Sequence, residues 1–246
     1  MISDLPISIS LFFGVTTLLT FLLFIRVIRR ASQEGIRKKA IPIAIGLLFW
    51  LLLQAVLMLQ GIYNTDRESF PPNIMLYGLF PAILGILLLF VTPRGRWFTD
   101  NLPLKNITYL HLVRIPVELI LYGLFIYGTI PELMTFEGRN FDILAGITAP
   151  FIAYYGVHKN KLPRSLIVIW NLICLALLIN IVINALLSAP FPLQQFAFEQ
   201  PNIAVLNFPF SWLPTFIVPV VLLMHLIALR QLLLQKKNFP DKTALK

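Results

Sequence analysis

Apolar residues form long runs along the chain, and short polar segments separate these runs. A helix needs about 20 apolar residues to cross a bilayer whose hydrocarbon core is ~30 Å thick. Windows of that length identify seven runs, at residues 6–28, 41–61, 73–92, 107–130, 142–157, 165–187 and 203–232. The pattern predicts an all-α polytopic membrane protein, with seven transmembrane helices in one domain over residues 1–246.

The composition agrees with a lipid environment. Hydrophobic residues make up 58% of the chain and charged residues only 13%, whereas a soluble domain has about a quarter charged residues. The mean hydropathy is +0.81. The lipid bilayer is therefore the first expected partner of this chain.

Charge alternates between successive connecting segments. One set is basic and contains Arg26, Arg29, Arg30, Arg37, Lys38, Lys39, Arg94, Arg96, Lys105, Lys159, Lys161, Arg164, Arg230, Lys236, Lys237, Lys242 and Lys246. The other set holds most of the acidic residues, with Asp66, Arg67, Glu68, Glu132, Glu137, Arg139, Asp142 and Glu199. Because basic loops stay in the cytoplasm, we expect the N-terminus outside and the C-terminus inside, in the plasma or inner membrane of the cell.

The net charge of +9 could indicate a nucleic-acid partner. However, the basic residues are divided among short segments beside the apolar runs and form no continuous face. We therefore expect them to contact anionic lipid at the cytoplasmic face of the membrane, and we expect no nucleic-acid partner.

The first three runs and the last three share sequence features. Pro-Asn-Ile begins the third run at 72–74 and recurs before the seventh run at 201–203. This match indicates a 3+1+3 arrangement, in which repeats 1–92 and 142–235 have the same orientation and helix 107–130 links them. Parallel repeats of this kind occur in transporters. The alternative is chance, since apolar segments resemble one another.

The fourth run carries ionisable residues within an otherwise apolar segment, LHLVRIPVELILYG. Charged side chains inside a membrane cost ~2.5 kcal/mol or more each, so they usually pair, face protein or serve a function. At ~100° per residue, His111, Arg114 and Glu118 fall within about 60° of one another, and Tyr122 continues the same stripe. This stripe is the strongest candidate for a functional site in the sequence.

A proton-linked secondary transporter is the first functional hypothesis. Glu118 is expected near the middle of the membrane, where it could take up and release a proton, while His111 could exchange protons with cytoplasmic water. Arg114 could anchor a small polar or anionic solute. In the sixth run, the amides of Asn180 and Asn184 could line a polar pathway or hydrogen-bond between helices.

An intramembrane metal- or haem-binding enzyme is the second hypothesis. His225 in the seventh run lies about as far from the inner boundary as His111, so the two could hold a metal or haem. No two histidines have a close metal-binding spacing, and Cys174 is the only cysteine, so the sequence requires no cofactor.

A sensor or assembly subunit without a catalytic site is the third hypothesis. Arg114 and Glu118 are four residues apart on one helix face, so they could neutralise each other and only fix helix packing. Such a subunit would bind a protein partner or further copies of itself.

The predicted outer loop before the fifth run is compact and polar, with Glu137, Arg139, Asn140 and Asp142 around a glycine. Asp142 could cap the fifth helix, and the loop could cover the outer mouth of a site between the fourth and fifth helices. The chain has no G-x-S-x-G elbow and no Walker A loop, which argues against hydrolase or nucleotide-driven chemistry within it.

Overall fold

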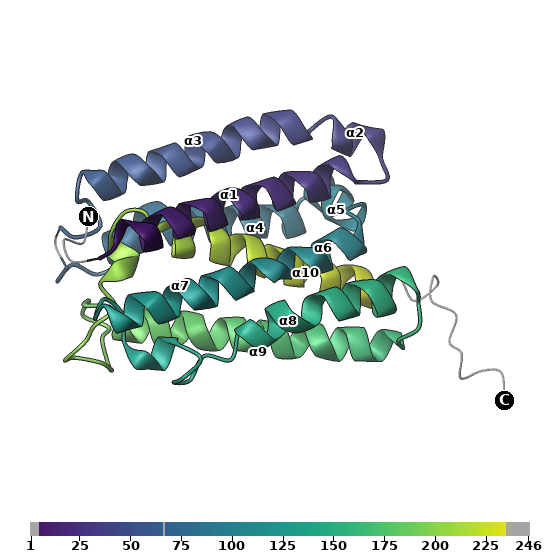
Figure 1. Ribbon diagram of the computed structural model, residues 1–246. Helices are drawn as coiled ribbons and strands as arrows, with labels where there is room; N and C mark the ends of the chain where they lie inside the picture. The colour runs from purple at the N-terminus through teal and green to yellow at the C-terminus, as the bar shows by residue number, and fades with distance from the viewer. Residues whose placement is uncertain (1–4, 66, 235–246) are drawn as a thin grey trace.

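The computed structural model describes residues 5–65 and 67–234, and every regular element in these ranges is a helix. The α-helices are α1 (Ile7–Arg29), α2 (Glu34–Arg37), α3 (Ala40–Leu59), α4 (Phe80–Val91), α5 (Pro93–Asp100), α6 (Leu104–Leu110), α7 (Arg114–Ile126), α8 (Ile143–Phe151), α9 (Arg164–Ser188) and α10 (Val218–Leu234). Shorter 3₁₀ or π turns are η1 (Met75–Leu79), η2 (His111–Val113), η3 (Glu132–Met134), η4 (Ile152–His158), η5 (Ala204–Leu206) and η6 (Leu213–Ile217). The longer helices lie side by side along a common direction (Figure 1). The predicted all-α class is confirmed.

Five helical segments are long and apolar enough to cross a bilayer, namely Ile7–Arg29, Glu34–Leu59, Leu104–Ile126, Arg164–Ser188 and Leu213–Leu234. A sixth is obtained when η1–α4 and α5 count as one span bent by 87°. The fifth predicted run corresponds to Ile143–His158, which is apolar but shorter than the others. The described residues therefore show a polytopic membrane protein with five or six helices that are long and apolar enough to cross a bilayer. The predicted number of seven spans is larger than this.

The position of a helix in the bundle does not follow from its hydropathy alone. In the apolar window of Leu213–Leu234, which includes α10, 67% of the residues are buried, against 17% for Glu34–Leu59, which includes α3. Leucines of the outer helices, such as Leu52 on α3 and Leu84 on α4, are more than half exposed. A wide apolar surface of this kind suits contact with lipid tails. α10 is thus an inner helix, whereas α3 and α4 present apolar surface to lipid.

The two ends of the bundle differ in charge. α2, α5 and the connection between η4 and α9 lie at one end of the bundle (Figure 1). The ranges 26–39, 94–105 and 159–164, which contain these segments, hold most of the basic residues of the chain. We call this the basic end. Arg230 joins α10 to α5 there, since its Nε donates to Asp100 Oδ1 at 2.6 Å and its Nη2 to Oδ2 at 3.0 Å.

The fourth predicted span is a broken helix, and the break positions the candidate site. α6 ends at Leu110, the 3₁₀ turn η2 follows, and α7 begins at Arg114. Pro116 has no N–H, and its ring would collide with the carbonyl of residue 112 in a regular α-helix, which favours this local change in geometry. Around the break, the side chains of His111, Arg114 and Glu118 are 0%, 2% and 1% exposed.

Candidate polar site inside the helix bundle

Arg114 is the centre of a buried set of hydrogen bonds. Its Nε donates to Asp142 Oδ2 at 2.6 Å, and its Nη2 donates to the other carboxylate oxygen of Asp142. Nη2 also donates to the backbone carbonyl of Cys174 at 3.1 Å, and Nη1 lies 3.1 Å from Nε2 of His225. A bidentate arginine–carboxylate pair of this kind is strong and directional. Arg114 therefore joins α7 to the start of α8, to α9 and to α10.

Asp142 pairs with Arg114 instead of capping the fifth predicted helix. It is the residue before α8, but its side chain accepts no hydrogen bond from the first turn of that helix. The close approach of α8 to α7 depends on Gly146, because a Cβ there would lie 3.1 Å from the backbone nitrogen of Ile115 and closer still to its side chain. A glycine one turn into α8 thus brings Asp142 within reach of Arg114.

Glu118 has an amide partner and no cationic one among the described residues. Asn140 Nδ2 lies 2.8 and 2.7 Å from the two carboxylate oxygens of Glu118, and it also donates to the carbonyl of Met134 at 3.0 Å. The expected pair between Arg114 and Glu118 is not formed. An arginine that precedes its carboxylate by four residues is the less favourable order for such a pair, and Arg114 has a better partner in Asp142.

Asn140 connects Glu118 to the ion pair. The backbone N–H of Asp142 donates to Asn140 Oδ1 at 3.1 Å. A continuous series of hydrogen bonds therefore links the residues that we call the polar network, which are Arg114, Glu118, Asn140, Asp142, Asn171 and His225.

The hydrogen bonds of His225 define its protonation state. Arginine can only donate, so Nε2 of His225 accepts from Arg114, and Nδ1 then carries the hydrogen and donates to Asn171 Oδ1 at 3.1 Å. The side-chain nitrogen of Asn171 donates in turn to the carbonyl of Ile167 at 2.9 Å, which fixes the amide orientation. His225 is therefore a neutral imidazole in this arrangement.

His111 lies beside the polar network but makes no hydrogen bond to it. Its ring stacks on that of His225, with centroids 3.9 Å apart and planes inclined by 22°, and meets the edge of Trp170 at 5.8 Å. Both ring nitrogens of His111 are buried without a hydrogen-bond partner in the part of the chain that the structure describes. Sequence reasoning identified both histidines, and the structure brings them together.

The geometry of the two histidines does not favour a shared metal or haem iron. Stacked rings do not direct a nitrogen from each side toward one ion, and both nitrogens of His225 already have partners. Across residues 5–65 and 67–234, no group of three His, Cys, Asp or Glu side chains is placed to hold a metal ion.

The remaining predicted site residues lie around the polar network. Tyr122 stacks on Phe136, with ring centroids 4.9 Å apart, and interacts with Glu137 of the loop. Asn180 on α9 donates to the carbonyl of Arg139 at 2.9 Å, and Asn184 donates to Asn180 at 3.4 Å. These residues fasten the 127–142 loop to α7 and α9, and none of their described hydrogen bonds reaches Arg114 or Glu118.

One member of the polar network, Asn171, was not among the candidate residues of the sequence. The backbone carbonyl of Cys174, which accepts from Arg114, carries no sequence signal either. The stronger indication was the charge of Arg114 itself, because a buried guanidinium needs a carboxylate and several acceptors. A search for these partners in the other runs leads to Asp142 and His225, whereas Asn171 bonds to His225 and not to Arg114.

Fold and site together define an integral membrane protein with a charged, hydrogen-bonded network buried among its helices. The chain belongs to a family described as a domain of unknown function (DUF8737), whose model matches residues 71–233. The matched range contains every residue of the polar network. No curated protein and no solved structure matches the chain.

Proposed function

We propose that this protein is a small secondary transporter that couples the movement of a small polar or anionic solute to protons. The observation that carries the proposal is the state of Glu118, a 1% exposed carboxyl whose described hydrogen bonds come from Asn140 alone. Arg114 is neutralised by Asp142, and His225 is neutral. An ionised Glu118 would leave one uncompensated charge inside the membrane, which is costly. Binding a proton removes that cost, so Glu118 is suited to carry one.

His111 is the second residue that supports proton transfer. Leaving a buried polar group without a partner costs about 1–3 kcal/mol, and the ring of His111 has two such nitrogens. A phenylalanine would pack against His225 without this cost. We infer that His111 accepts and releases protons at the side of the site nearer the basic end, while Glu118 does so nearer the 127–142 loop.

Arg114 gives the site its preference for anions. In this mechanism an anionic solute replaces Asp142 at the guanidinium of Arg114, which can bind a carboxylate or phosphate through two parallel N–H groups. The proton on Glu118 is gained or lost as the charge next to it changes. Transport in either direction requires α7 and α8 to separate enough to break the Arg114–Asp142 pair.

We also propose seven spans, with the N-terminus outside and the C-terminus inside the plasma or inner membrane. In support, the 127–142 loop followed by α8 and η4 leads from the far end of α7 back to the basic end, beside α9 (Figure 1). The third and seventh runs of the proposed 3+1+3 repeat each contain a π turn, but η1 begins directly after Ile74 and η6 only ten residues after Ile203, so the repeat rests on the Pro-Asn-Ile match. These turns pack together, and a Cβ on Gly78 would lie 2.5 Å from Cγ2 of Thr215.

The test uses purified protein in vesicles that contain a pH-sensitive dye, with amino acids, monocarboxylates, dicarboxylates or phosphate added outside. We expect at least one of these solute classes to enter together with protons and so change the pH inside the vesicles. We expect Glu118→Gln to abolish that change in pH. Glutamine has the shape of a protonated glutamate and can still accept from Asn140, so the variant should fold. Glu132→Gln, which changes an exposed carboxyl of the 127–142 loop, is the matched control and should transport like wild type.

Two results would count against the proposal. Proton movement that persists in Glu118→Gln would remove Glu118 from the mechanism. Failure of every solute class to move protons through the wild-type protein would remove transport itself.

A sensor or assembly subunit is the second candidate, because the polar network is closed in this conformation. Its six residues are at most 5% exposed, and the nearby cavity of about 110 Å³ beside Met134 is lined by apolar residues. For such a subunit, Glu118→Gln should leave function unchanged. The protein should also purify with a partner chain or as a homo-oligomer.

A further inference from the structure

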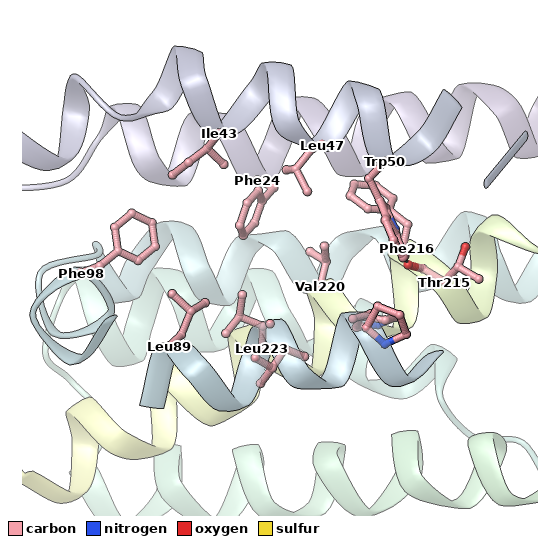
Figure 2. Close-up of a pocket in the computed structure, with 15 residues that line it drawn as sticks. Phe24, Ile43, Leu47, Trp50, Leu89, Phe98, Thr215, Phe216, Val220 and Leu223 are labelled. Atoms are coloured by element: carbon pink, nitrogen blue, oxygen red, sulfur yellow. The ribbon is translucent and has the colours of Figure 1, made fainter. Parts of the chain in front are cut away.

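A cavity of about 360 Å³ lies between α3 and α4, away from the polar network. Figure 2 shows Ile43, Leu47 and Trp50 extending from α3 toward Leu89 and Leu223 on the other side. Cavities of ~300–1,000 Å³ are the size that holds small ligands in proteins. This one is separate from the site proposed for transport.

The lining of the cavity is apolar, and its two polar side chains are already engaged. Trp50 Nε1 donates to the carbonyl of Thr215 at 3.0 Å, and Thr215 Oγ1 donates to the carbonyl of Ser211 at 2.8 Å. The other lining side chains are hydrocarbon or glycine, including Phe24, Ile86 and Val220. An occupant therefore gains nothing from polar groups inside the cavity, which suits a hydrocarbon chain.

The cavity is open toward the surrounding lipid. Pro81 and Gly85 of α4 line it and are exposed, and a Cβ on Gly85 would have no atom within 4 Å. α3 is tied to its neighbours beyond the cavity, where Gln54 donates to the carbonyl of Tyr77 at 3.0 Å. α3 is thus attached at the end away from the basic end, and it is separated from α4 along the length of the cavity.

The length of the cavity matches one leaflet of a bilayer. It extends along α3 from Ile43 to Trp50 and along α4 from Pro81 to Leu89, which corresponds to about 10–12 Å of helix. One leaflet supplies roughly half of the ~30 Å hydrocarbon core. A single acyl chain that enters from the nearer leaflet would therefore fit along it.

The nearer leaflet is the one at the basic end, where exposed cations lie on α5 and just before α3, next to elements that line the cavity. Phe98 of α5 lines the cavity, and the preceding residue, Trp97, has Lys39 Nζ 5.4 Å from its ring centroid. Lys39, Arg94 and Arg96 are exposed. Within the described residues, no carboxylate forms a salt bridge with any of the three.

From these observations we propose that the groove between α3 and α4 is a binding site for an anionic phospholipid. One acyl chain occupies the cavity, and the phosphate headgroup lies against Lys39, Arg94 and Arg96. Trp97 sits at the boundary between the two, where amphipathic rings are common in membrane proteins.

Native mass spectrometry of the purified protein, mixed with equal amounts of phosphatidylglycerol and phosphatidylcholine, tests the site. We expect wild type to retain one phosphatidylglycerol. Gly85→Leu fills the cavity from α4 and should lose this lipid. Gly46→Leu, the same change at an exposed glycine of α3 outside the cavity, is the matched control and should keep it.

The headgroup is tested by charge removal. Lys39→Gln and Arg96→Gln should each weaken retention about fivefold, while Lys161→Gln, elsewhere at the basic end, should not. Protection of the buried Cys174 from a thiol reagent verifies that each variant is folded.

Three outcomes would overturn the proposal. Equal loss of bound phosphatidylglycerol in Gly85→Leu and Gly46→Leu would mean that the cavity holds no acyl chain. Equal retention of phosphatidylcholine and phosphatidylglycerol would rule out selection by charge. A second copy of the chain in place of lipid would make the groove a dimer contact, and none of these results depends on transport.

Discussion

At the scale of single residues, a variant of His111 can show whether the buried site has a structural role or a chemical one. Phenylalanine at this position keeps a flat ring against His225 and removes two buried nitrogens that have no described partner. We expect His111→Phe to be as stable as wild type, or more stable by up to about 1–3 kcal/mol, while it loses proton-coupled transport. Cys174 is the only cysteine and is buried, so its reaction with a thiol dye on heating measures stability. A fully active variant would show that the ring only packs.

The Arg114–Asp142 pair makes a second residue-scale prediction. Removing one partner of a buried ion pair costs about 3–5 kcal/mol because the other charge remains alone, whereas replacing both with apolar residues restores much of the stability. We expect Asp142→Leu to unfold well below wild type, and Arg114→Met combined with Asp142→Leu to unfold above the single variant. A single variant as stable as wild type would mean that Glu118 had become the partner of Arg114. That result would contradict a protonated Glu118.

The sequence identified Arg114 and Glu118 but assigned them to each other. Their spacing placed them on one helix face, which made them the nearest charges along the chain. The actual partner of Arg114 lies 28 residues further on, in a position where the sequence indicated only a helix cap. Which two helices cross, and at what depth, depends on close approaches such as that at Gly146. Residue spacing within one run carries no information on that approach.

At the scale of elements, the bend between α4 and α5 depends on Gly95. A Cβ on this residue would lie 2.5 Å from both the Cα and the carbonyl oxygen of Leu89, and backbone atoms cannot move aside as a flexible side chain can. We expect Gly95→Ala to lose about 1–3 kcal/mol of stability. Gly85→Ala, on α4 and with open space around it, is the control and should be neutral or slightly stabilising. Equal thermal midpoints for the two variants would show that the bend adjusts freely.

The hydrogen bond from Tyr63 to Gln54, which lies at the end of α3 away from the basic end, leads to a prediction about pH. Tyr63 is 1% exposed, its hydroxyl donates to Gln54, and burial raises the pKa of Tyr63 above its usual value of about 10. The folded protein therefore holds this proton more tightly than the unfolded chain. The resulting stability is present below about pH 10 and is lost as the pH rises further.

Tyr63→Phe isolates this contribution. At pH 7 the variant leaves an oxygen of Gln54 without its donor, so we expect it to be less stable by about 1–3 kcal/mol. Above about pH 10 only wild type has the Tyr63 hydroxyl to titrate, so the difference in unfolding midpoint should shrink. A difference that stays constant through the alkaline range would contradict the role of the Tyr63 proton.

At the scale of the whole molecule, the sequence predicted the class of fold but not the order of its layers. The segments containing α3 and α10 have similar mean hydropathy, 2.4 and 2.2, yet 17% and 67% of their apolar windows are buried. In water a difference in burial would appear as a polar face on the outer helix. In a membrane, lipid tails are as apolar as the protein interior, so no such pattern is needed. The central place of α10 therefore depends on packing and on specific polar contacts, such as that of His225 with Arg114 and that of Arg230 with Asp100, which mean hydropathy does not record.

The orientation of the whole chain gives the last prediction. The native protein has one thiol, and it is buried, so cysteines introduced at exposed positions can be labelled separately. With seven spans and the N-terminus outside, Glu132→Cys should react with a membrane-impermeant thiol reagent in intact cells. Ser32→Cys and Lys161→Cys, at the basic end, should react only after the membrane is opened.

Lys161→Cys decides the number of spans, because only Ile143–His158 separates it from Glu132 as a crossing segment. The 9 residues of α8 and the 7 of η4 extend at most about 24 Å, which is less than the ~30 Å hydrocarbon core. Such a helix crosses if the bilayer thins around it or if flanking side chains such as Lys159 reach out to the headgroups. Labelling from opposite sides would show that it crosses. Labelling of both cysteines from the same side would show that Ile143–His158 does not cross the membrane. The second unit of the parallel repeat would then have only two spans, and the repeat would be wrong.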